Sequence, residues 1–468
     1  MKKLFFLFTL SYTTFAQSNQ KKIDSVRVLL EKAYNEKNSA KIFELAGETF
    51  QKQLPETEIN KVINQLNAQL GAWKSSEFQK NTDGVAQYKG TFEKANQNVL
   101  LSLDKQDKIS TLFFQPYTGD KPKKDYPVAT DNKMTTPLDM RVDSVVRPYI
   151  QWKHTASVAI AVIKDGKVYT YNYGETKRDN KTLPDPDKTL YEIGSISKTF
   201  TATLLAEEVV KGKMSLEDPI NKYLPDSIGN MAYKDVPITL KTLSNHSSGF
   251  PRLPINLYKQ GDPINDPYKN YDTQRMFTYL KNFKPFREVG VNYEYSNFAV
   301  GLLGQILATY NHTSYEKLLQ ERITKPLKMK NTFITIPADQ AVNFAQGYNE
   351  KGEATSAWDL NTLAGAGGIR STINDLVKYI NAQMDKAPEK LQKAIDLTHQ
   401  VTFEKGQTIV GLGWHTGKMK EQTIFQHSGG TGGFRTLVAF DKENKIGVVV
   451  LSNTAEEVAP IGFELLKK

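Results

Sequence analysis

A stretch without periodicity divides this chain of 468 residues into two parts. Residues 116–137 are rich in Pro, Lys, Asp and Thr and have neither helical nor strand spacing, which is typical of a linker between domains. The hydrophobic content of 39% is sufficient for a core on each side, and it excludes a disordered chain. The sequence therefore predicts an N-terminal module over residues 20–115 and a larger domain over residues 138–468.

The first sixteen residues have the pattern of a cleavable export signal. Lys2 and Lys3 precede the apolar stretch Leu4 to Leu10, and Thr14-Phe15-Ala16 places small residues where a signal peptidase cleaves. The apolar stretch is shorter than the roughly 20 residues that a membrane-spanning helix needs. We expect a signal peptide over residues 1–16, a periplasmic or secreted protein and no transmembrane segment after cleavage. An uncleaved N-terminal anchor is the alternative.

The N-terminal module has helical patterns followed by strand patterns. Helices are expected over residues 24–37, 40–50 and 56–73, and short strands over 87–92, 98–103 and 109–114. Helices followed by a strand meander indicate an α+β module, similar on this pattern alone to the small cone-shaped domains of the nuclear-transport-factor-like type. It has no acid pair or histidine arranged as a site, so we expect it to pack or to assist substrate approach.

Charge and composition exclude several classes of function. The net charge is +10, but lysines are dispersed among acids without a run of like charge, so a nucleic-acid partner is not expected. The absence of cysteine excludes a disulfide scaffold, a thiolate zinc site and a cysteine nucleophile. His154, His312 and His399 have no ligand spacing, so we expect no metal and no cofactor. Any nucleophile must be an oxygen or an amine.

The second domain has strand patterns at both of its ends. Its expected elements are a helix over 140–151, a hairpin of 157–164 with 167–173, strands at 436–441 and 446–452, and a helix over 460–467. Strands at both ends with helices between them predict one antiparallel sheet beside a helical lobe.

Ser195 and Lys198 form the strongest local signal for chemistry. The two lie three residues apart at the start of an apolar helix that ends near Gly212, so they share one helix face. The amine can then approach the hydroxyl, which places a base beside a nucleophile. Ser197 would point to another face, and we expect it to support the site without reacting. Because Ser-x-x-Lys is a common spacing, other residues must complete the argument.

Two later segments add polar groups. Tyr295 and Asn297 lie at the turn that enters an apolar helix over residues 298–307, which presents a phenol and a carboxamide together. His427-Ser428-Gly429-Gly430 leads into a strand, and its glycines permit close approach of a substrate backbone.

These three motifs, in this order, resemble those of the serine hydrolases related to class C β-lactamases, DD-peptidases and penicillin-recognising esterases. The segments around Leu243 to Gly249, Ala366 to Thr372 and Gly411 to Trp414 also resemble the family, and the resemblance covers residues 138 to 468. It implies an α/β serine β-lactamase-like fold, with the active site between an antiparallel sheet and a helical lobe.

The resemblance also implies a role for each residue. Ser195 would be the acylated nucleophile, and Lys198 its proton acceptor. Tyr295 would be a second general base that assists deacylation, and Asn297 would bind the substrate beside Ser428 and Gly429. The backbone N–H groups of Ser195 and Gly430 would hold the oxyanion. Either Lys198 must lose its proton near neutral pH or Tyr295 must ionise.

The third motif departs from the β-lactamase pattern, because His427 stands where β-lactamases of this group generally have lysine. Histidine there resembles the esterase and peptidase branches and lowers the expected efficiency on β-lactams. His415-Thr416-Gly417 fits the same short pattern, but it lacks the glycine string, so we prefer His427. We expect His427 to be a catalytic residue together with Ser195, Lys198 and Tyr295. His246 lies in a polar stretch, where a buried or capping role is favoured over catalysis.

We therefore expect an exported serine hydrolase that forms an acyl-enzyme on Ser195. Its substrate would be a small molecule or a peptide, with an amide or ester bond in a D-amino-acid peptide, a cell-wall fragment or a small ester. The alternatives are a class C-type β-lactamase and a penicillin-binding sensor that is acylated without turnover. The sequence does not indicate an oligomeric state.

Overall fold

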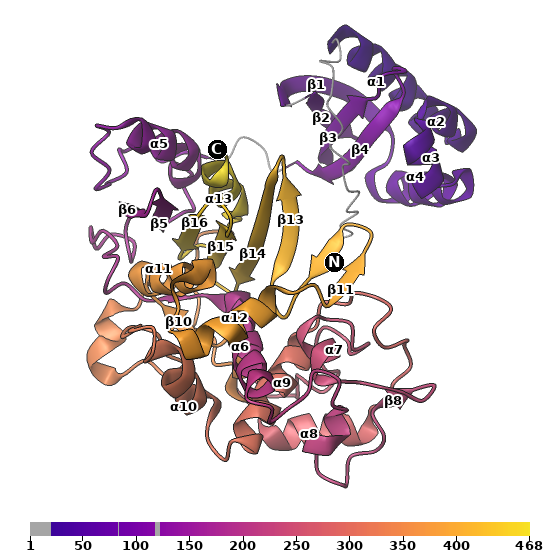
Figure 1. Cartoon of the computed structure of the whole chain (residues 1–468). Coiled ribbons are helices and arrows are strands. Elements are labelled where there is room, and N and C mark those ends of the chain that lie inside the picture. The colour runs from indigo at the N-terminus through magenta and orange to yellow at the C-terminus, as the bar shows by residue number, and fades with distance from the viewer. Residues whose placement is uncertain (1–19, 83, 118–121) are drawn as a thin grey trace. The chain divides into compact units, whose positions relative to one another are not determined.

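The chain forms two compact units, one ending at Lys121 and one beginning at Pro122 (Figure 1). The computed structural model describes residues 20–82, 84–117 and 122–468, so the expected signal peptide over residues 1–16 lies outside the described residues. No helix within those three ranges is both long and apolar enough to cross a bilayer.

The first unit is a four-stranded antiparallel sheet packed on helices. Its elements are α1 (Gln20–Asn35), α2 (Ser39–Leu45), α3 (Glu48–Gln53), α4 (Glu56–Leu70), β1 (Trp73–Thr82), β2 (Val85–Phe92), β3 (Asn96–Leu103) and β4 (Ile109–Pro116). The strands follow one another in the order β1-β2-β3-β4. Buried and partly exposed side chains alternate along β2, so one face of the strand packs into the core, where Tyr34 meets Trp73 edge to face with ring centroids 5.8 Å apart. The expected α+β class of this module is confirmed.

Two details of this unit differ from the sequence prediction. The helix expected to reach Trp73 ends at Leu70, because Gly71 adopts a positive φ of 74°, and the unpredicted strand β1 starts at Trp73. Most β1 side chains are exposed and polar, so its sequence lacks strand alternation. The single helix expected over residues 40–50 is two helices, separated where Gly47 donates its N–H to Ile109 O at 2.9 Å.

The second unit contains a large antiparallel sheet and a helical lobe. Its helices are α5 (Pro137–Ile150), α6 (Ser197–Val210), α7 (Leu240–Ser244), α8 (Thr273–Asn282), α9 (Asn297–Tyr310), α10 (Tyr315–Leu319), α11 (Ile373–Asn381), α12 (Glu389–His399) and α13 (Ala459–Leu466). The large sheet contains β5 (Ser157–Lys164), β6 (Lys167–Gly174), β11 (Phe403–Lys405), β12 (Thr408–Val410), β13 (His415–Met419), β14 (Gln422–Gly430), β15 (Arg435–Asp441) and β16 (Ile446–Ser452). Two short ladders join β7 (Tyr191–Glu192) to β10 (Arg370–Ser371) and β8 (Ala232–Tyr233) to β9 (Val236–Pro237).

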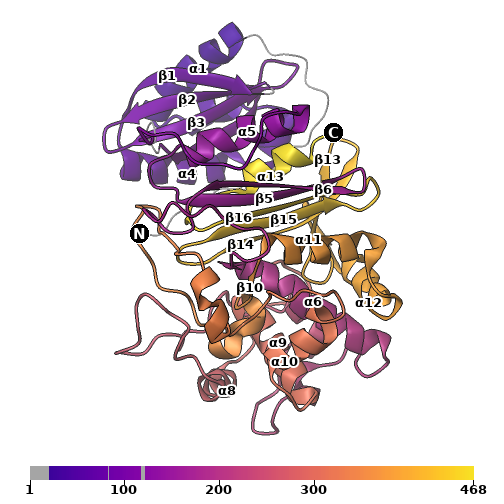
Figure 2. The same cartoon turned by 90° about the vertical axis from the view of Figure 1, so that its left-hand side faces the viewer.

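The sheet is built from both ends of this unit, as predicted. Its order is β11-β12-β13-β14-β15-β16-β5-β6, so the late strand β16 pairs with the early strand β5. The β5–β6 turn has positive φ at both Asp165 and Gly166, as a two-residue hairpin turn requires. Figure 2 shows α5 and α13 on one face of the sheet and the helical lobe with α6 and α11 on the other.

Part of the segment predicted as a linker packs on this second unit. Val128 is buried against α5 and the sheet, and Gly174 N donates to Ala129 O at 2.9 Å.

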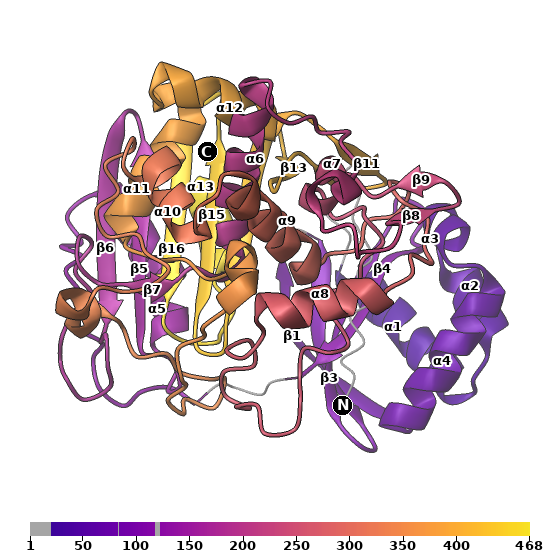
Figure 3. The same ribbon diagram turned by 90° about the horizontal axis from the view of Figure 1, so that it is seen from below.

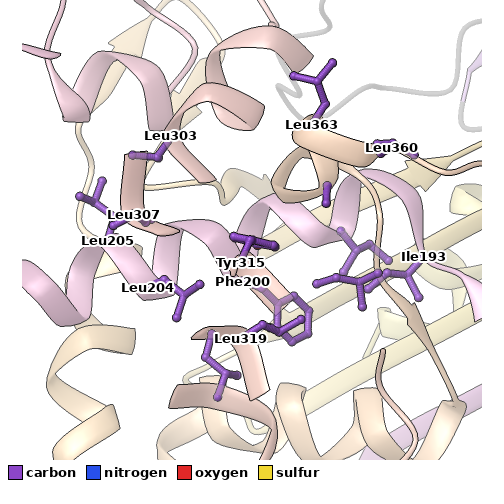
Figure 4. Packing of buried hydrophobic residues seen from close by; sticks show 14 of the residues in the cluster. Ile193, Phe200, Leu204, Leu205, Leu303, Leu307, Tyr315, Leu319, Leu360 and Leu363 are labelled. Carbon is purple, nitrogen blue, oxygen red and sulfur yellow. The ribbon is translucent and has the colours of Figure 1, made fainter. Parts of the chain in front are cut away.

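Helix α6 runs through the middle of the lobe, beside α9 and α12 (Figure 3). All its side chains from Ser197 to Ala206 are buried, and Phe200, Leu204 and Leu205 lie in the core shown in Figure 4. Buried threonines on this helix satisfy their hydroxyls locally: Thr203 Oγ1 donates to Thr199 O at 2.9 Å. The first turns of the helix that carries Lys198 are therefore enclosed by packed side chains around their whole circumference.

Candidate active site

Ser195 lies in a short 3-10 turn, η1 (Gly194–Ile196), immediately before α6. Lys198 is in the first turn of α6 and is fully buried. Its Nζ lies 2.9 Å from Ser195 Oγ and donates to Ala366 O at 2.6 Å. Ser197 Oγ accepts the N–H of Ile369 at 3.2 Å, in keeping with its expected supporting position. The turn thus places the predicted nucleophile against a buried amine.

The surroundings of Lys198 disfavour its charged form. Burial holds the pKa of Lys198 well below its usual value, and the positive charge of Arg252 lowers it further. Within the described residues, no carboxylate forms an ion pair with Lys198. Both effects favour the neutral amine, which is the form that can accept a proton.

Tyr295 lies just before α9, whose N-cap is Ser296. Its ring centroid is 4.9 Å from Lys198 Nζ and 5.1 Å from the guanidinium carbon of Arg252. Burial raises the pKa of Tyr295 to about 12, although a hydrogen bond with Ser195 and the charge of Arg252 oppose this rise. The phenol is therefore protonated at neutral pH. Of the two routes left open by the sequence, this geometry favours deprotonation of the lysine.

The loop before Arg252 is tied to the turn that carries Tyr295. His246 adopts a positive φ of 64°, accepts the N–H of Ser296 on Nδ1 at 3.1 Å, and stacks 4.4 Å from the Tyr295 ring. Pro251 O accepts the Ser296 hydroxyl at 2.7 Å. His246 is thus a buried residue that orients the tyrosine turn, as expected from the sequence.

Two glycines bring strand β14 against the nucleophile turn. Gly194 has a φ of 53°, and a Cβ there would lie 2.6 Å from Gly430 N. A Cβ on Gly429 would lie 2.0 Å from Ile193 O. Only glycine fits at both places, so the backbone of Ser195 and that of Gly430 lie side by side.

Beyond residue 426, β14 extends past β13. The β13 pairing ends at Gln426, whereas the segment from His427 to Gly430 continues to pair with β15. This segment, with Ser428 and Gly430 exposed, therefore has an open backbone edge next to Ser195.

Both histidines that fit the third motif are near the site. His427 is buried, and its Nδ1 donates to Ser428 O at 2.7 Å. Its Nε2 has no partner among the described residues. Because a carbonyl only accepts, Nδ1 carries the proton. His415 lies one strand away, with its Nε2 2.7 Å from the Tyr293 hydroxyl. Burial lowers the pKa of His415 to about 4 and that of His427 well below its usual value, so both rings are neutral at neutral pH. His427-Ser428-Gly429 is the stretch that contacts the nucleophile turn.

These histidines do not form a metal site. Although His246, His415 and His427 cluster, no group of three potential ligands within the described part of the chain is arranged to hold a metal ion.

Asn297 begins α9 and donates its backbone N–H to Arg252 O at 2.9 Å. Its side chain interacts with the Tyr268 hydroxyl, whereas its buried Oδ1 has no hydrogen-bond partner among the residues described. Tyr268 also contacts Trp358, with ring centroids 5.4 Å apart. The carboxamide of Asn297 thus lies next to a pair of aromatic rings and keeps one acceptor atom unused.

Sequence reasoning missed several residues that shape the site. Arg252 is a single arginine in a loop, where no spacing marks it. Ala366 contributes its backbone carbonyl, which accepts a hydrogen bond from Lys198. Every residue type has such a carbonyl, so the sequence gives no signal for it. A buried pair, Arg370 with Glu192 at 3.4 Å, holds the segment that includes Trp358, and only the fold brings its two members together.

Comparisons with known proteins agree with this geometry. Residues 142–465 match the sequence profile of the family described as Beta-lactamase, and residues 29–112 match one described as a protein of unknown function, DUF3887. A β-lactamase of Pseudomonas fluorescens is 32% identical over 351 residues, which cover 68% of this chain and 94% of that protein.

Solved structures give the same result for the second unit. A class C β-lactamase has 29% identity and a TM-score of 0.63, over 70% of this chain and 97% of its own. A β-lactamase/D-alanine carboxypeptidase from Pseudomonas syringae has 25% identity and a TM-score of 0.63, over 71% and 99%. The resemblance and the fold class expected from the sequence are confirmed, and the chain belongs to the β-lactamase family of serine hydrolases.

Proposed function

We propose that this protein is an exported hydrolase that cleaves an amide or ester bond through an acyl-enzyme on Ser195. The substrates would be D-amino-acid peptides, cell-wall fragments or small esters. The observation that carries the proposal is the fully buried Lys198, with its Nζ 2.9 Å from Ser195 Oγ. A neutral amine at that distance can take the hydroxyl proton as the oxygen attacks.

In the acylation step, the proton that Ser195 loses is returned to the leaving group through Lys198 and Tyr295. Ser195 Oγ forms a bond to the substrate carbonyl carbon, and its proton moves to Lys198 Nζ. The bond to the leaving group breaks, and the leaving group takes a proton from the Tyr295 hydroxyl, which Lys198 resupplies. The raised pKa of Tyr295, about 12, supports a protonated phenol in this role.

Deacylation reverses the proton path. Water attacks the ester carbonyl, and its proton passes through Tyr295 to Lys198. The bond between the acyl carbon and Ser195 Oγ then breaks, Lys198 returns the proton to Oγ, and the acid product is released. In both steps the carbonyl oxygen becomes negative and would accept hydrogen bonds from Ser195 N and Gly430 N, whose segments the glycine contacts hold together.

The open edge of β14 would hold the substrate backbone. An extended peptide can pair with the segment from His427 to Gly430, as strands add to exposed sheet edges. The carboxamide of Asn297 would bind the amide on the acyl side. His427 would offer its unpartnered Nε2 as a hydrogen-bond acceptor.

Hydrolysis of β-lactams is the second candidate. The identity of 32% to a β-lactamase over 94% of that protein favours it. The neutral His427 opposes it, since no lysine charge stands in the third motif to attract the carboxylate of the drug.

Intact-protein mass spectrometry after mixing with benzylpenicillin, with the fate of the drug followed in the same tube, tests both candidates. Parallel reactions contain an N-acylated D-Ala-D-Ala peptide and a small ester. Ser195→Ala is the test variant, and Ser144→Ala, at an exposed serine, is the matched control. Turnover of peptide or ester that is lost only in Ser195→Ala supports the proposal. Rapid drug destruction supports a β-lactamase, and a persistent adduct without turnover of any substrate indicates a sensor. Full turnover by Ser195→Ala would overturn the assignment of the nucleophile.

A further inference from the structure

Thr201 and Tyr315 form a hydrogen-bonded pair that the proposed mechanism does not use. Thr201 lies in α6 and is fully buried. Tyr315 begins α10 and lies in the core of the helical lobe, where Figure 4 labels it. Thr201 Oγ1 lies 2.6 Å from the Tyr315 hydroxyl and 2.7 Å from Gly365 O. The two hydroxyl groups thus connect α6 and α10 to the backbone of the residue before Ala366.

The hydrogen bonds of this pair can run in only one direction. A carbonyl oxygen only accepts, so the single hydroxyl hydrogen of Thr201 goes to Gly365 O, and Tyr315 must donate to Thr201 Oγ1. Ser197 O, at 3.4 Å, is a more distant acceptor for the same hydrogen. Burial raises the pKa of Tyr315, which keeps this donor protonated. The order of donation is therefore from Tyr315 to Thr201 to Gly365.

The segment that contains Ala366 is attached to α6 at two points. Thr201 donates to Gly365 O, and Ser197 Oγ accepts the N–H of Ile369 at 3.2 Å. Ser197 and Thr201 are four residues apart, so they lie on one face of the helix. The two attachments lie before and after Ala366, so they fix the place of its carbonyl along α6.

Close packing against α9 restricts the same segment. A Cβ on Gly365 would lie 3.1 Å from Thr201 Oγ1 and 3.2 Å from Gly304 Cα. A Cβ on Gly304 would lie 3.4 Å from the Tyr315 ring. The segment and α9 therefore approach each other backbone to backbone, and the Thr201 hydroxyl lies at this contact.

The Ala366 carbonyl can act on Lys198 in two ways. It lies 2.6 Å from Nζ, and an N–H group held there leaves the lone pair of the neutral amine available to Ser195 Oγ, 2.9 Å away. When Lys198 then takes the hydroxyl proton, the ammonium forms in a fully buried place. The same carbonyl accepts a charge-assisted hydrogen bond from this ammonium, which stabilises it.

We propose that Thr201 and Tyr315 are positioning residues for proton transfer, which hold the Ala366 carbonyl where it orients Lys198 toward Ser195 and stabilises the ammonium formed during acylation. The inference rests on the proposed function, because it takes Lys198 as the base. It makes the rate depend on two hydroxyl groups that belong to none of the three sequence motifs.

Rates of the folded variants give the first test, with thermal denaturation to confirm that each variant is folded. The probes are acylation of Ser195 by benzylpenicillin, followed as a mass adduct, and turnover of p-nitrophenyl butyrate. Thr201→Val should slow acylation by about 10- to 100-fold with little change in KM, as misplacement of reacting groups does. Thr201→Ser keeps the hydroxyl and should restore most of the rate. Thr203→Val is the matched control, because it removes a buried hydroxyl of α6 that donates within the helix, to Thr199 O.

A double-mutant cycle tests whether the two residues act along one path. Tyr315→Phe should slow acylation by about 2- to 10-fold, which corresponds to the loss of one hydrogen bond. Because Tyr315 acts through Thr201, the double variant Thr201→Val/Tyr315→Phe should be no slower than Thr201→Val alone. Losses that multiply in the double variant would overturn the inference, as would equal rates of Thr201→Val and Thr203→Val.

The pH profile separates positioning from a general loss of packing. Without the Ala366 carbonyl the ammonium is less stable, so the pKa of the acid limb of kcat/KM, which Lys198 sets in the proposed mechanism, should move downward in Thr201→Val. The charged and titratable groups around Lys198 are Arg252, Tyr295, His246, His415 and His427. Among the described residues, the hydrogen-bond partners of Thr201 are Ser197, Tyr315 and Gly365, so the substitution leaves those five groups in place. An acid limb that does not move would overturn the inference.

A crystal structure of Thr201→Val gives a readout that needs no turnover. The distance between Lys198 Nζ and Ala366 O, 2.6 Å in wild type, should increase beyond the hydrogen-bond limit of about 3.5 Å. An unchanged distance would overturn the inference. Failure of the proposed function is distinct, since it appears as wild-type protein that gives neither an adduct nor turnover with any substrate.

Discussion

The two units of the chain differ in whether they bury cationic and imidazole side chains. The first unit buries mainly apolar side chains, with the aromatic rings of Tyr34, Trp73 and Phe92 at its centre, and its lysines stay on the surface. The second unit fully buries Lys198 and His246 in its helical lobe. Because burial of such groups costs free energy, their presence without an acid partner in the described part of the chain indicates where the fold serves chemistry.

Replacement of the buried amine should give the largest effect. Lys198→Met keeps an unbranched side chain of similar length and removes the base, so acylation of Ser195 should slow by about 10²- to 10⁴-fold. The melting temperature should not fall, since an apolar chain suits the site better than an amine. Stopped-time mass spectrometry and thermal denaturation measure the two effects. Loss of activity that arises from an unfolded variant would contradict this prediction.

A substitution at Gly429 tests the close contact between β14 and the nucleophile turn of the second unit, and should give the next largest effect. In Gly429→Ala the added methyl group would lie 2.0 Å from Ile193 O, so the nucleophile turn and β14 must separate. Separation of the two oxyanion donors should lower kcat by about 10²-fold. Gly417→Ala on β13 is the matched control, because a Cβ there meets nothing within 4 Å. Equal effects of the two changes would show that the close contact is unimportant.

Stability as a function of pH should also separate wild type from Lys198→Met. The folded-state pKa of Lys198 lies well below the value of 10.5 that a free lysine has, so between these two values the unfolded chain binds more protons than the folded one. The free energy of unfolding of wild type should therefore rise with pH in that window, by up to about 1.4 kcal/mol per pH unit, relative to the variant. Urea unfolding of both proteins from neutral pH toward 10.5 measures the difference. A constant difference would mean that Lys198 is charged in the folded protein.

The smallest effect on activity is expected in the first unit. Tyr34→Ala removes a fully buried ring and should cost that unit about 3–5 kcal/mol of stability. Hydrolysis of a small substrate should change less than about twofold, because every residue of the candidate site belongs to the second unit. Unfolding monitored by tryptophan fluorescence and turnover of a small ester are the two measurements. A large loss of turnover would assign the first unit a part in catalysis.

The sequence predicts those parts of the site that have local spacing. Ser195 and Lys198 are three residues apart, and Tyr295 and Asn297 stand at a helix start, so short patterns mark them. Arg252 could not be predicted, because only the fold brings its guanidinium over the Tyr295 ring. Strand β1 was not predicted, because its exposed polar side chains do not alternate with apolar ones. The helix break at Gly47 was not predicted either, because it depends on a hydrogen bond to Ile109. Tertiary contacts outweigh local preference in both cases.

The pairing of β16 with β5 sets the order in which the second unit can form during synthesis. Ser157 donates to Asn453, 296 residues further along the chain, and the two strands lie side by side in the sheet. At about 5–20 residues per second, a ribosome needs roughly 15–60 s to make that span, and β5 has no native neighbour on that side for the whole time. A nascent chain of this protein therefore stays open long after its first strands exist, which gives a chaperone time to act before the sheet closes.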